Sequence, residues 1–243
     1  MSPNFLRTQV TRFVILFVER SGSTYLATLL DAHEDVLARR EEFAQMRQRG
    51  AGGAEQLEWA SQFFSPPLIG KHKAIGFKTK IVDILDQDGF AQLLEKNSCR
   101  IIQLYRRNAV KAVISTINAK RLHEASGNWN LLKETDRLNS FSVDLDEFER
   151  LLKERQDWDR EVENFANRLK LPSLVLYYED MLLDEDSFKK SVFDFIGVRY
   201  LPVKGKTMKN TKDDLREAIV NFDQLRNKFV GTIYEPMFDE VLV

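Results

Sequence analysis

Cysteine and histidine are scarce in this 243-residue chain, which has one cysteine and three histidines. The single cysteine, Cys99, cannot form an internal disulfide, which excludes a small secreted scaffold stapled by disulfide bonds. The histidines lie far apart in the sequence and no Cys-x-x-Cys pair is present, so we expect no bound metal.

Long apolar runs are also missing. The longest early one, residues 13–18, is six residues long, far short of the ~20 that a membrane-spanning helix needs. Glu19 and Arg20 follow directly, where a signal peptide would have small residues before its cleavage site. We therefore expect no transmembrane segment, no signal peptide and a cytoplasmic location.

Neither sign of charge is in excess, because 36 Lys and Arg face 37 Asp and Glu for a net charge of -1. Bulk positive charge is what attracts nucleic acid, so we expect no nucleic-acid partner. What the chain does have is 43% hydrophobic and 11% aromatic residues, enough for a packed core. Its length predicts a single domain over residues 1–243.

Continuous apolar runs rich in β-branched and aromatic residues predict strands that are buried on both faces, as in a parallel sheet. Helical patterns separate these strands, which predicts an α/β protein, a three-layer fold with a mainly parallel central sheet. The predicted strands are residues 12–18, 74–77, 100–105 and 173–178. The predicted helices include residues 81–94, 144–169 and 187–196, and a helical stretch that begins at 213–222.

A strand, a polar turn and a helix follow one another twice, each time with arginine in the turn. The first turn holds Arg20, Ser21, Gly22, Ser23 and Thr24. A helix N-terminus with a glycine, three hydroxyls and an arginine suits a phosphate or sulfate group. The alternative is that a hydroxyl of this turn only caps the helix. The turn lacks the GxxxxGK[ST] and GxGxxG patterns, which argues against ATP hydrolysis and dinucleotide binding.

The residues Arg-Ser-Gly-Ser-Thr-Tyr-Leu at 20–26 resemble the donor-binding loop of sulfotransferases that use 3′-phosphoadenosine-5′-phosphosulfate (PAPS). The likeness is strongest to the carbohydrate and bacterial branches of that superfamily. It implies a fold similar to that of the P-loop NTPases and a loop that holds the 5′-phosphosulfate of the donor. The residues so implicated are Arg20, Ser21, Gly22, Ser23, Thr24 and Tyr25.

The second turn strengthens the resemblance. Members of the family bind the 3′-phosphate with an arginine at a strand end and a serine eight positions later, the spacing of Arg107 and Ser115. Because eight helical residues span ~12 Å, the Arg107 side chain must fold back toward Ser115. Arg106 is treated as an electrostatic neighbour. The alternative is a surface arginine and a serine bonded to its own helix. A basic loop that closes over the nucleotide in some relatives points to Lys206 or Lys209.

The resemblance implies transfer of a sulfuryl group from PAPS to an acceptor hydroxyl, without a metal and with 3′-phosphoadenosine 5′-phosphate (PAP) as product. Arg20 would stabilise charge on the bridging oxygen. A glutamate of the Arg-Arg-Glu-Glu-Phe segment, Glu41 ahead of Glu42, would be the general base. Lys78, in a Gly-Phe-Lys strand end, would orient the sulfonate or acceptor. The alternatives are a solvated charge cluster and a surface lysine.

The acceptor is left open between a sugar, a lipid and a small metabolite. Residues 44–73 and 121–143 are weakly patterned and are interpreted as flaps over an acceptor site. Trp59, Phe63, Phe64 and Trp129 are candidates to line it, although most aromatic side chains belong to a core. Two other functions compete, namely a nucleotide-dependent, kinase-like enzyme of related fold and a non-catalytic nucleotide-binding relative.

Overall fold

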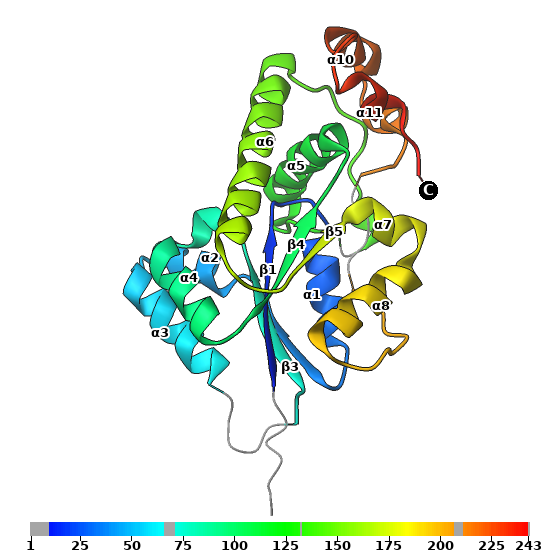
Figure 1. Cartoon of the computed structure of the whole chain (residues 1–243). Coiled ribbons are helices and arrows are strands. Elements are labelled where there is room, and N and C mark those ends of the chain that lie inside the picture. Colours follow the sequence, from blue (N-terminus) through cyan, green and yellow to red (C-terminus); the bar gives the residue numbers. More distant parts are fainter. Residues whose placement is uncertain (1–9, 66–70, 132, 207–210, 243) are drawn as a thin grey trace, which may run out of the picture.

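A computed structural model describes residues 10–65, 71–131, 133–206 and 211–242 of the chain (Figure 1). Five strands form one sheet in the order β2-β3-β1-β4-β5, and every neighbouring pair is parallel. The strands are β1 (Thr11–Phe17), β2 (Val36–Arg39), β3 (Ala74–Thr79), β4 (Arg100–Tyr105) and β5 (Ser173–Tyr177). The chain visits β2 and β3 on one side of β1 before β4 and β5 on the other. The end of β1 is therefore the topological switch point, where α/β sheets bind ligands.

The sheet is covered on both faces because its central strands are apolar throughout. Phe13 and Ile15 of β1 pack toward α1 (Ser23–Asp31) and α8 (Glu185–Ile196). Val14 and Leu16 point to the opposite face. That face is covered by helices that Figure 1 shows together on the left, namely α2 (Glu42–Gln48), α3 (Gly53–Phe64) and α4 (Gln87–Lys96).

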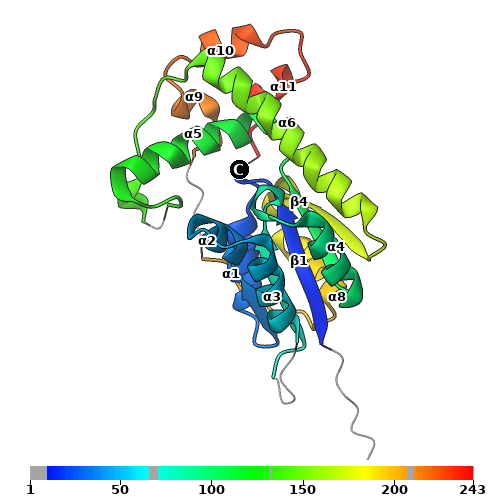
Figure 2. The same cartoon turned by 90° about the vertical axis from the view of Figure 1, so that its left-hand side faces the viewer.

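A group of helices lies beyond the carboxyl end of the sheet, as Figure 2 shows. It contains α5 (Ala109–Ser126), α6 (Leu145–Arg168), α9 (Leu215–Ala218), α10 (Phe222–Lys228) and α11 (Glu235–Asp239). These helices have an apolar cluster of their own, in which Val113, Phe148 and Leu225 are buried. The second half of α6 descends onto the sheet through Val162 and Phe165. The amphipathic pattern thus predicted a core-covering helix correctly.

The expected α/β fold with a parallel central sheet is confirmed, with several corrections in detail. Strand β2 was missed because four residues are too few for a clear pattern. The helix predicted over 81–94 exists but begins later, at Gln87. A 3-10 turn over Ile81–Asp83 precedes α4, and Asp86 caps that helix through the N–H of Gly89. Residues 44–73, predicted to be irregular or short-helical, contain most of α2 and all of α3.

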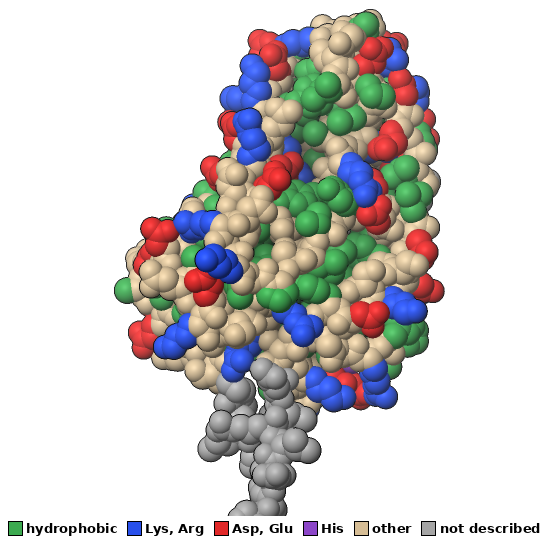
Figure 3. Space-filling view, in the orientation of Figure 1, with side chains coloured by type: hydrophobic (Ala, Val, Ile, Leu, Met, Phe, Trp, Pro, Cys, Tyr) green, Lys and Arg blue, Asp and Glu red, His purple; other side chains and the backbone are tan. Residues whose placement is uncertain are grey.

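The prediction that residues 173–178 form a buried strand is wrong in one respect. The strand exists, but β5 lies at the sheet edge and Val175 is 46% exposed. A short helix, α7 (Tyr178–Leu183), follows it without a loop, and a 3-10 turn covers Glu134–Asp136. In the described part of the chain, no helix is both long and apolar enough to cross a bilayer. On the face seen in Figure 3, acidic and basic side chains are interspersed.

Candidate active site

The loop after β1 turns sharply at Gly22, whose φ of 84° lies in the left-handed region. A Cβ atom there would meet the Tyr178 ring at 2.7 Å, so only glycine fits. Helix α1 then begins at Ser23, and no side chain caps it. The capping alternative is therefore wrong. Helix N-termini present unpaired N–H groups, which suit an anion.

Two further residues of the loop are engaged within the protein. Ser21 is fully buried and its hydroxyl donates to the carbonyl of Val18 at 2.6 Å. The Tyr25 hydroxyl donates to the carboxylate of Glu185. Burial, aided by this hydrogen bond, raises the pKa of Tyr25 to about 12. Both contacts fix the shape of the loop, and Tyr25 also lines the neighbouring pocket.

Arg20 crosses from the first turn to the second unit. Its Nε donates to Oγ of Ser115 at 2.9 Å, and its Nη1 lies 3.3 Å from the carbonyl of Trp129 and from Oδ1 of Asn130. Burial lowers the pKa of Arg20, and the charge of Glu19 opposes that shift. The structure thus brings Arg20 and Ser115 together, two residues that were assigned to opposite ends of the donor.

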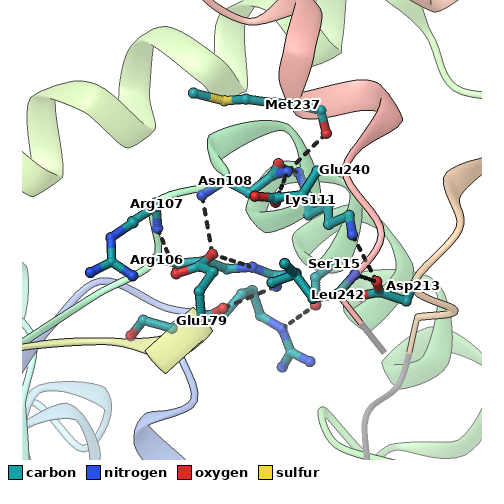
Figure 4. A network of polar contacts seen from close by, with 12 residues as sticks. Arg106, Arg107, Asn108, Lys111, Ser115, Glu179, Asp213, Met237, Glu240 and Leu242 are labelled. Atoms are coloured by element: carbon teal, nitrogen blue, oxygen red, sulfur yellow. Dashed lines mark hydrogen bonds and ion pairs between the residues drawn. The ribbon is translucent and has the colours of Figure 1, made fainter. Parts of the chain in front are cut away.

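The two arginines of the second turn point in different directions, as Figure 4 shows. Arg107 turns outward, where its Nη2 binds Asp180 at 2.9 Å and its guanidinium lies 3.9 Å from the centre of the Tyr177 ring. It does not meet Ser115. Arg106 is buried and lines the pocket beside the first loop. The feature of the sequence that indicates a role for Arg106 is its position directly after Tyr105, the last residue of β4.

Glu179 and Asn108 hold this second turn in place. The Glu179 carboxylate accepts the backbone N–H groups of Arg107 at 2.9 Å and of Asn108 at 3.1 Å. The Asn108 side chain caps α5 through the N–H of Lys111 and also donates to the carbonyl of Met237. The carboxyl-terminal helix is therefore tied to the same turn (Figure 4).

Lys111 is a pocket residue that the sequence analysis missed. Its side chain is 4% exposed and its Nζ pairs with Asp213 at 3.1 Å. It lies one helical turn before Ser115, and residues at this spacing share a helix face. This four-residue spacing is the feature of the sequence that indicates Lys111, because a lysine on the same helix face as Ser115 points toward the same ligand.

Lys78 links the first loop to a glutamate. Its side chain is 1% exposed, so the surface alternative is wrong. The Nζ atom lies 3.2 Å from the Ser23 hydroxyl, 3.0 Å from the Thr24 hydroxyl and 2.8 Å from Oε1 of Glu41. Burial lowers the pKa of Lys78, and the charge of Glu41 opposes the shift. Of the two adjacent glutamates, Glu41 is the one that pairs with Lys78. Glu42 is the first residue of α2.

A pocket of about 330 Å³ lies between the two turns. It is rich in cations, and Asn130 of the predicted 121–143 flap is part of its wall. Three buried or half-buried cations and a helix N-terminus in one cavity favour a ligand with several negative charges. The residues from the two turn-helix units that line it are Arg20, Gly22, Ser23, Thr24, Tyr25, Arg106, Lys111 and Ser115.

The remaining candidates lie elsewhere. Phe64 is fully buried, and Trp59 and Phe63 pack with it against Phe77 in the core. Trp129 is 53% exposed and stacks on His123 at 4.2 Å. Lys206 contributes a backbone N–H to the Thr28 hydroxyl. Lys209 lies outside the described residues.

Comparisons with known proteins find similarity over most of the chain. The model of the sulfotransferase domain matches residues 11–230. Nodulation protein H of Rhizobium tropici is 24% identical over 237 residues, covering 93% of this chain and 92% of that protein. Nodulation protein H of Rhizobium meliloti is 24% identical over 241 residues, covering 93% and 94%.

The fold is also similar to that of a solved sulfotransferase. The crystal structure of a sulfotransferase from Alicyclobacillus acidocaldarius superposes with a TM-score of 0.52 at 16% identity, covering 94% of this chain and 95% of that one. With a family model that spans most of the sequence, the chain belongs to the sulfotransferase family and is a sulfotransferase enzyme.

Proposed function

We infer that the enzyme transfers the sulfuryl group of PAPS to an acceptor hydroxyl, with Glu41 as general base. The observation that carries this proposal is the position of Lys78 between the Ser23 and Thr24 hydroxyls and the Glu41 carboxylate. A single buried ammonium thereby places a carboxylate beside the loop expected to hold the 5′-phosphosulfate. That is the arrangement which a base acting on an incoming hydroxyl requires.

The chemistry follows from these positions. The acceptor oxygen forms a bond to sulfur while the bond from sulfur to the bridging oxygen of PAPS breaks, and the hydroxyl proton passes to the Glu41 carboxylate. Negative charge then develops on the bridging oxygen. The Arg20 guanidinium and the N–H groups at the start of α1 stabilise this charge, and the product PAP departs. An arginine acts here as a fixed positive charge and not as an acid.

For the 3′-phosphate, the proposal keeps Ser115 and tests two arginines. The spacing in the sequence favours Arg107, whereas the position of the guanidinium favours Arg106, which lines the pocket together with Lys111. Arg107 reaches Ser115 only after it releases Asp180. Lys209 is proposed to cover the nucleotide from the carboxyl-terminal loop.

For the acceptor, the proposal is a sugar, a lipid or another small hydroxyl compound, held by residues 44–73 and 121–143. Asn130 and Trp129 support the second segment, since one lines the pocket and the carbonyl of the other contacts Arg20. The names of the two relatives called nodulation protein H do not indicate which of these acceptor classes this enzyme uses.

The test is a transfer assay with isotopically labelled PAPS and pools of sugars, lipids and small alcohols. PAP, which is adenosine 3′,5′-bisphosphate, is expected to raise the melting temperature of the protein without magnesium. ATP or AMP is expected to raise it much less. Labelled product in one acceptor pool supports the proposal. A preference for ATP with magnesium, in binding and in turnover, contradicts it and supports the kinase-like alternative. Donor binding with no transfer to any pool supports a non-catalytic relative.

A further inference from the structure

Three consecutive backbone carbonyls at the start of the first loop each accept a hydrogen bond from a side chain. The Val18 carbonyl accepts from the Ser21 hydroxyl at 2.6 Å. The Glu19 carbonyl accepts from Nη1 of Arg155 at 2.8 Å, and the Arg20 carbonyl from Nη1 of Arg106 at 3.3 Å. The donors come from the loop itself, from α6 and from the turn after β4.

These contacts orient the peptide groups of the loop. In a planar trans peptide, the C=O and the following N–H point in opposite directions. Arg155 of α6 holds the Glu19 carbonyl, so the N–H of the same peptide group, which belongs to Arg20, points away from Arg155. Holding the carbonyls of Glu19 and Arg20 also fixes the two peptide groups that flank the Cα atom of Arg20.

Arg20 needs this support because its backbone is strained. Its φ of 63° lies in the left-handed region, which is unfavourable for a residue with a side chain. Such a conformation persists only where its surroundings impose it. In this loop, Arg155 holds the peptide group before Arg20, and Arg106 holds the one after it. The conformation so imposed is the one from which the Arg20 side chain reaches Ser115.

Arg155 itself makes no wall of the pocket between the two turns. It lies on α6, its side chain is 3% exposed, and Asp159, one helical turn on, binds its Nε at 3.0 Å. That carboxylate orients the guanidinium so that Nη1 meets Glu19. A buried arginine at this place acts on a ligand only through the loop.

We propose that Arg155 is a positioning residue, which holds the Glu19–Arg20 peptide group so that Arg20 and the loop amides face the sulfated nucleotide. The proposal rests on the function inferred above for the donor. Removal of Arg155 then frees the loop to relax, and donor binding weakens although no group that touches the donor has changed. The pocket keeps all its charged side chains.

The test compares three variants of the full-length enzyme. In Arg155→Met the aliphatic volume stays and the donors are lost, whereas in Arg155→Lys one ammonium can serve the Glu19 carbonyl or Asp159 but not both. Arg150→Met is the control on the same helix, because Arg150 is exposed and pairs only with Glu154 among the contacts of the described residues. Kinetic constants for PAPS and acceptor, the dissociation constant of PAP and the melting temperature are measured for each.

Arg155→Met is expected to raise the dissociation constant of PAP and the KM for PAPS by about 10- to 100-fold, as loss of a supporting contact typically does. The KM for the acceptor stays near the wild-type value. The donor constants of Arg155→Lys are expected to lie between those of the wild type and those of Arg155→Met. The donor constants of Arg150→Met are expected to equal the wild-type values. Unchanged donor constants in Arg155→Met, with or without a lower melting temperature, overturn the proposal.

Two arms keep the test decisive. If Arg155→Met does not fold, Arg155→Lys decides, and wild-type donor constants in that variant overturn the proposal. Inorganic pyrophosphate serves as a second probe of the loop, because its binding does not depend on the identity of the nucleotide. A wild type that binds pyrophosphate but neither PAP nor PAPS contradicts the proposed function, and the comparison of pyrophosphate affinities still tests Arg155.

Discussion

Nε of Arg20 donates to Oγ of Ser115 at 2.9 Å, although the two residues are 95 positions apart in the sequence. One follows the central strand β1 and the other lies on the helix after the neighbouring strand β4. The two residues assigned to opposite ends of the donor thus contact each other directly.

Removing either partner should have different consequences. Arg20→Ala is expected to lower kcat by about 10²- to 10³-fold, because a charge that stabilises the leaving oxygen is lost. Ser115→Ala removes one hydrogen bond and is expected to weaken PAP binding by about 5- to 10-fold. Single-turnover kinetics and calorimetric titration measure the two effects. Equal losses of kcat in both variants contradict the separate roles.

Glu41 and Glu42 form a matched pair for testing the base. Glu41→Gln keeps the size of the side chain and removes its basicity, so kcat should fall by about 10²- to 10⁴-fold while PAP still binds. Glu42→Gln should keep most of its activity, because it is Glu41 that contacts Lys78. Initial rates with saturating PAPS make the comparison. Wild-type rates in both variants would show that neither carboxylate is the base, and equal losses in both would contradict the choice of Glu41 over Glu42.

Burial lowers the pKa of Lys78. The pH dependence of donor binding should follow the protonation of this side chain. A lowered pKa means that the ammonium loses its proton, and with it the attraction for an anion, at a lower pH than an ordinary lysine. PAP affinity should therefore fall on the alkaline side. Glu41→Gln removes the charge that raises this pKa and should move the fall to lower pH, whereas Lys78→Arg should move it higher.

Titration of PAP binding against pH in the wild type and both variants measures this order. The phosphate groups of the nucleotide are fully ionised throughout the alkaline range, so a change of affinity there reports a group of the protein. An identical profile in all three proteins would assign the pH dependence to another group.

The 3′-phosphate offers a test of Arg106 against Arg107. Adenosine 3′,5′-bisphosphate should stabilise the wild type more than AMP does, since only the former has a 3′-phosphate. Arg106→Met is expected to lose this preference by about 10- to 100-fold in affinity, the value of a charge-assisted contact. Arg107→Ala is expected to keep it, because Asp180 holds that side chain outside the pocket.

The measurement is the ratio of the two dissociation constants in each variant. Arg107→Lys controls for the loss of charge at the surface. Loss of the ratio in Arg107→Ala alone would mean that the Asp180 pair opens when nucleotide binds, and it would support the spacing of eight residues between Arg107 and Ser115.

Gly22→Ala tests the shape of the loop. A methyl group at this position meets the Tyr178 ring at 2.7 Å, and the φ of 84° is strained for any residue with a Cβ atom. The free energy of unfolding is expected to fall by about 1–2 kcal/mol, and PAP binding to weaken with it. Gly50→Ala is the control for φ alone, since its φ is 85° and nothing lies within 4 Å of the added Cβ.

Residues within one turn were predictable because their chemistry depends on neighbours in the chain. An apolar run ending in Arg-Ser-Gly-Ser-Thr indicates a strand, a tight turn and a helix N-terminus, and each of these is local. The same holds for β4 and the start of α5. Glu41 or Glu42 remained undecided because adjacent residues on the sequence differ only in the direction of their side chains.

That direction depends on packing. The Arg106 side chain lines the pocket, whereas the Arg107 side chain turns outward and pairs with Asp180 of α7. Lys111 was overlooked because a buried lysine looks like a surface lysine until its partner, Asp213, is known. The pair joins distant segments, so the spacing from Ser115 could indicate the helix face of Lys111 but not its partner.

Local patterns of apolar, polar and glycine residues were enough to predict the class of fold, the family and the loop that is proposed to hold the donor. Which charged groups meet depends on the packing of segments that lie far apart in the sequence. The tertiary structure placed Lys78 against Glu41 and Arg155 against the carbonyl of Glu19. A buried charge requires polar partners. Packing supplies Lys78 with a distant carboxylate, and it supplies Arg155, whose ion-pair partner Asp159 lies on the same helix, with a distant carbonyl.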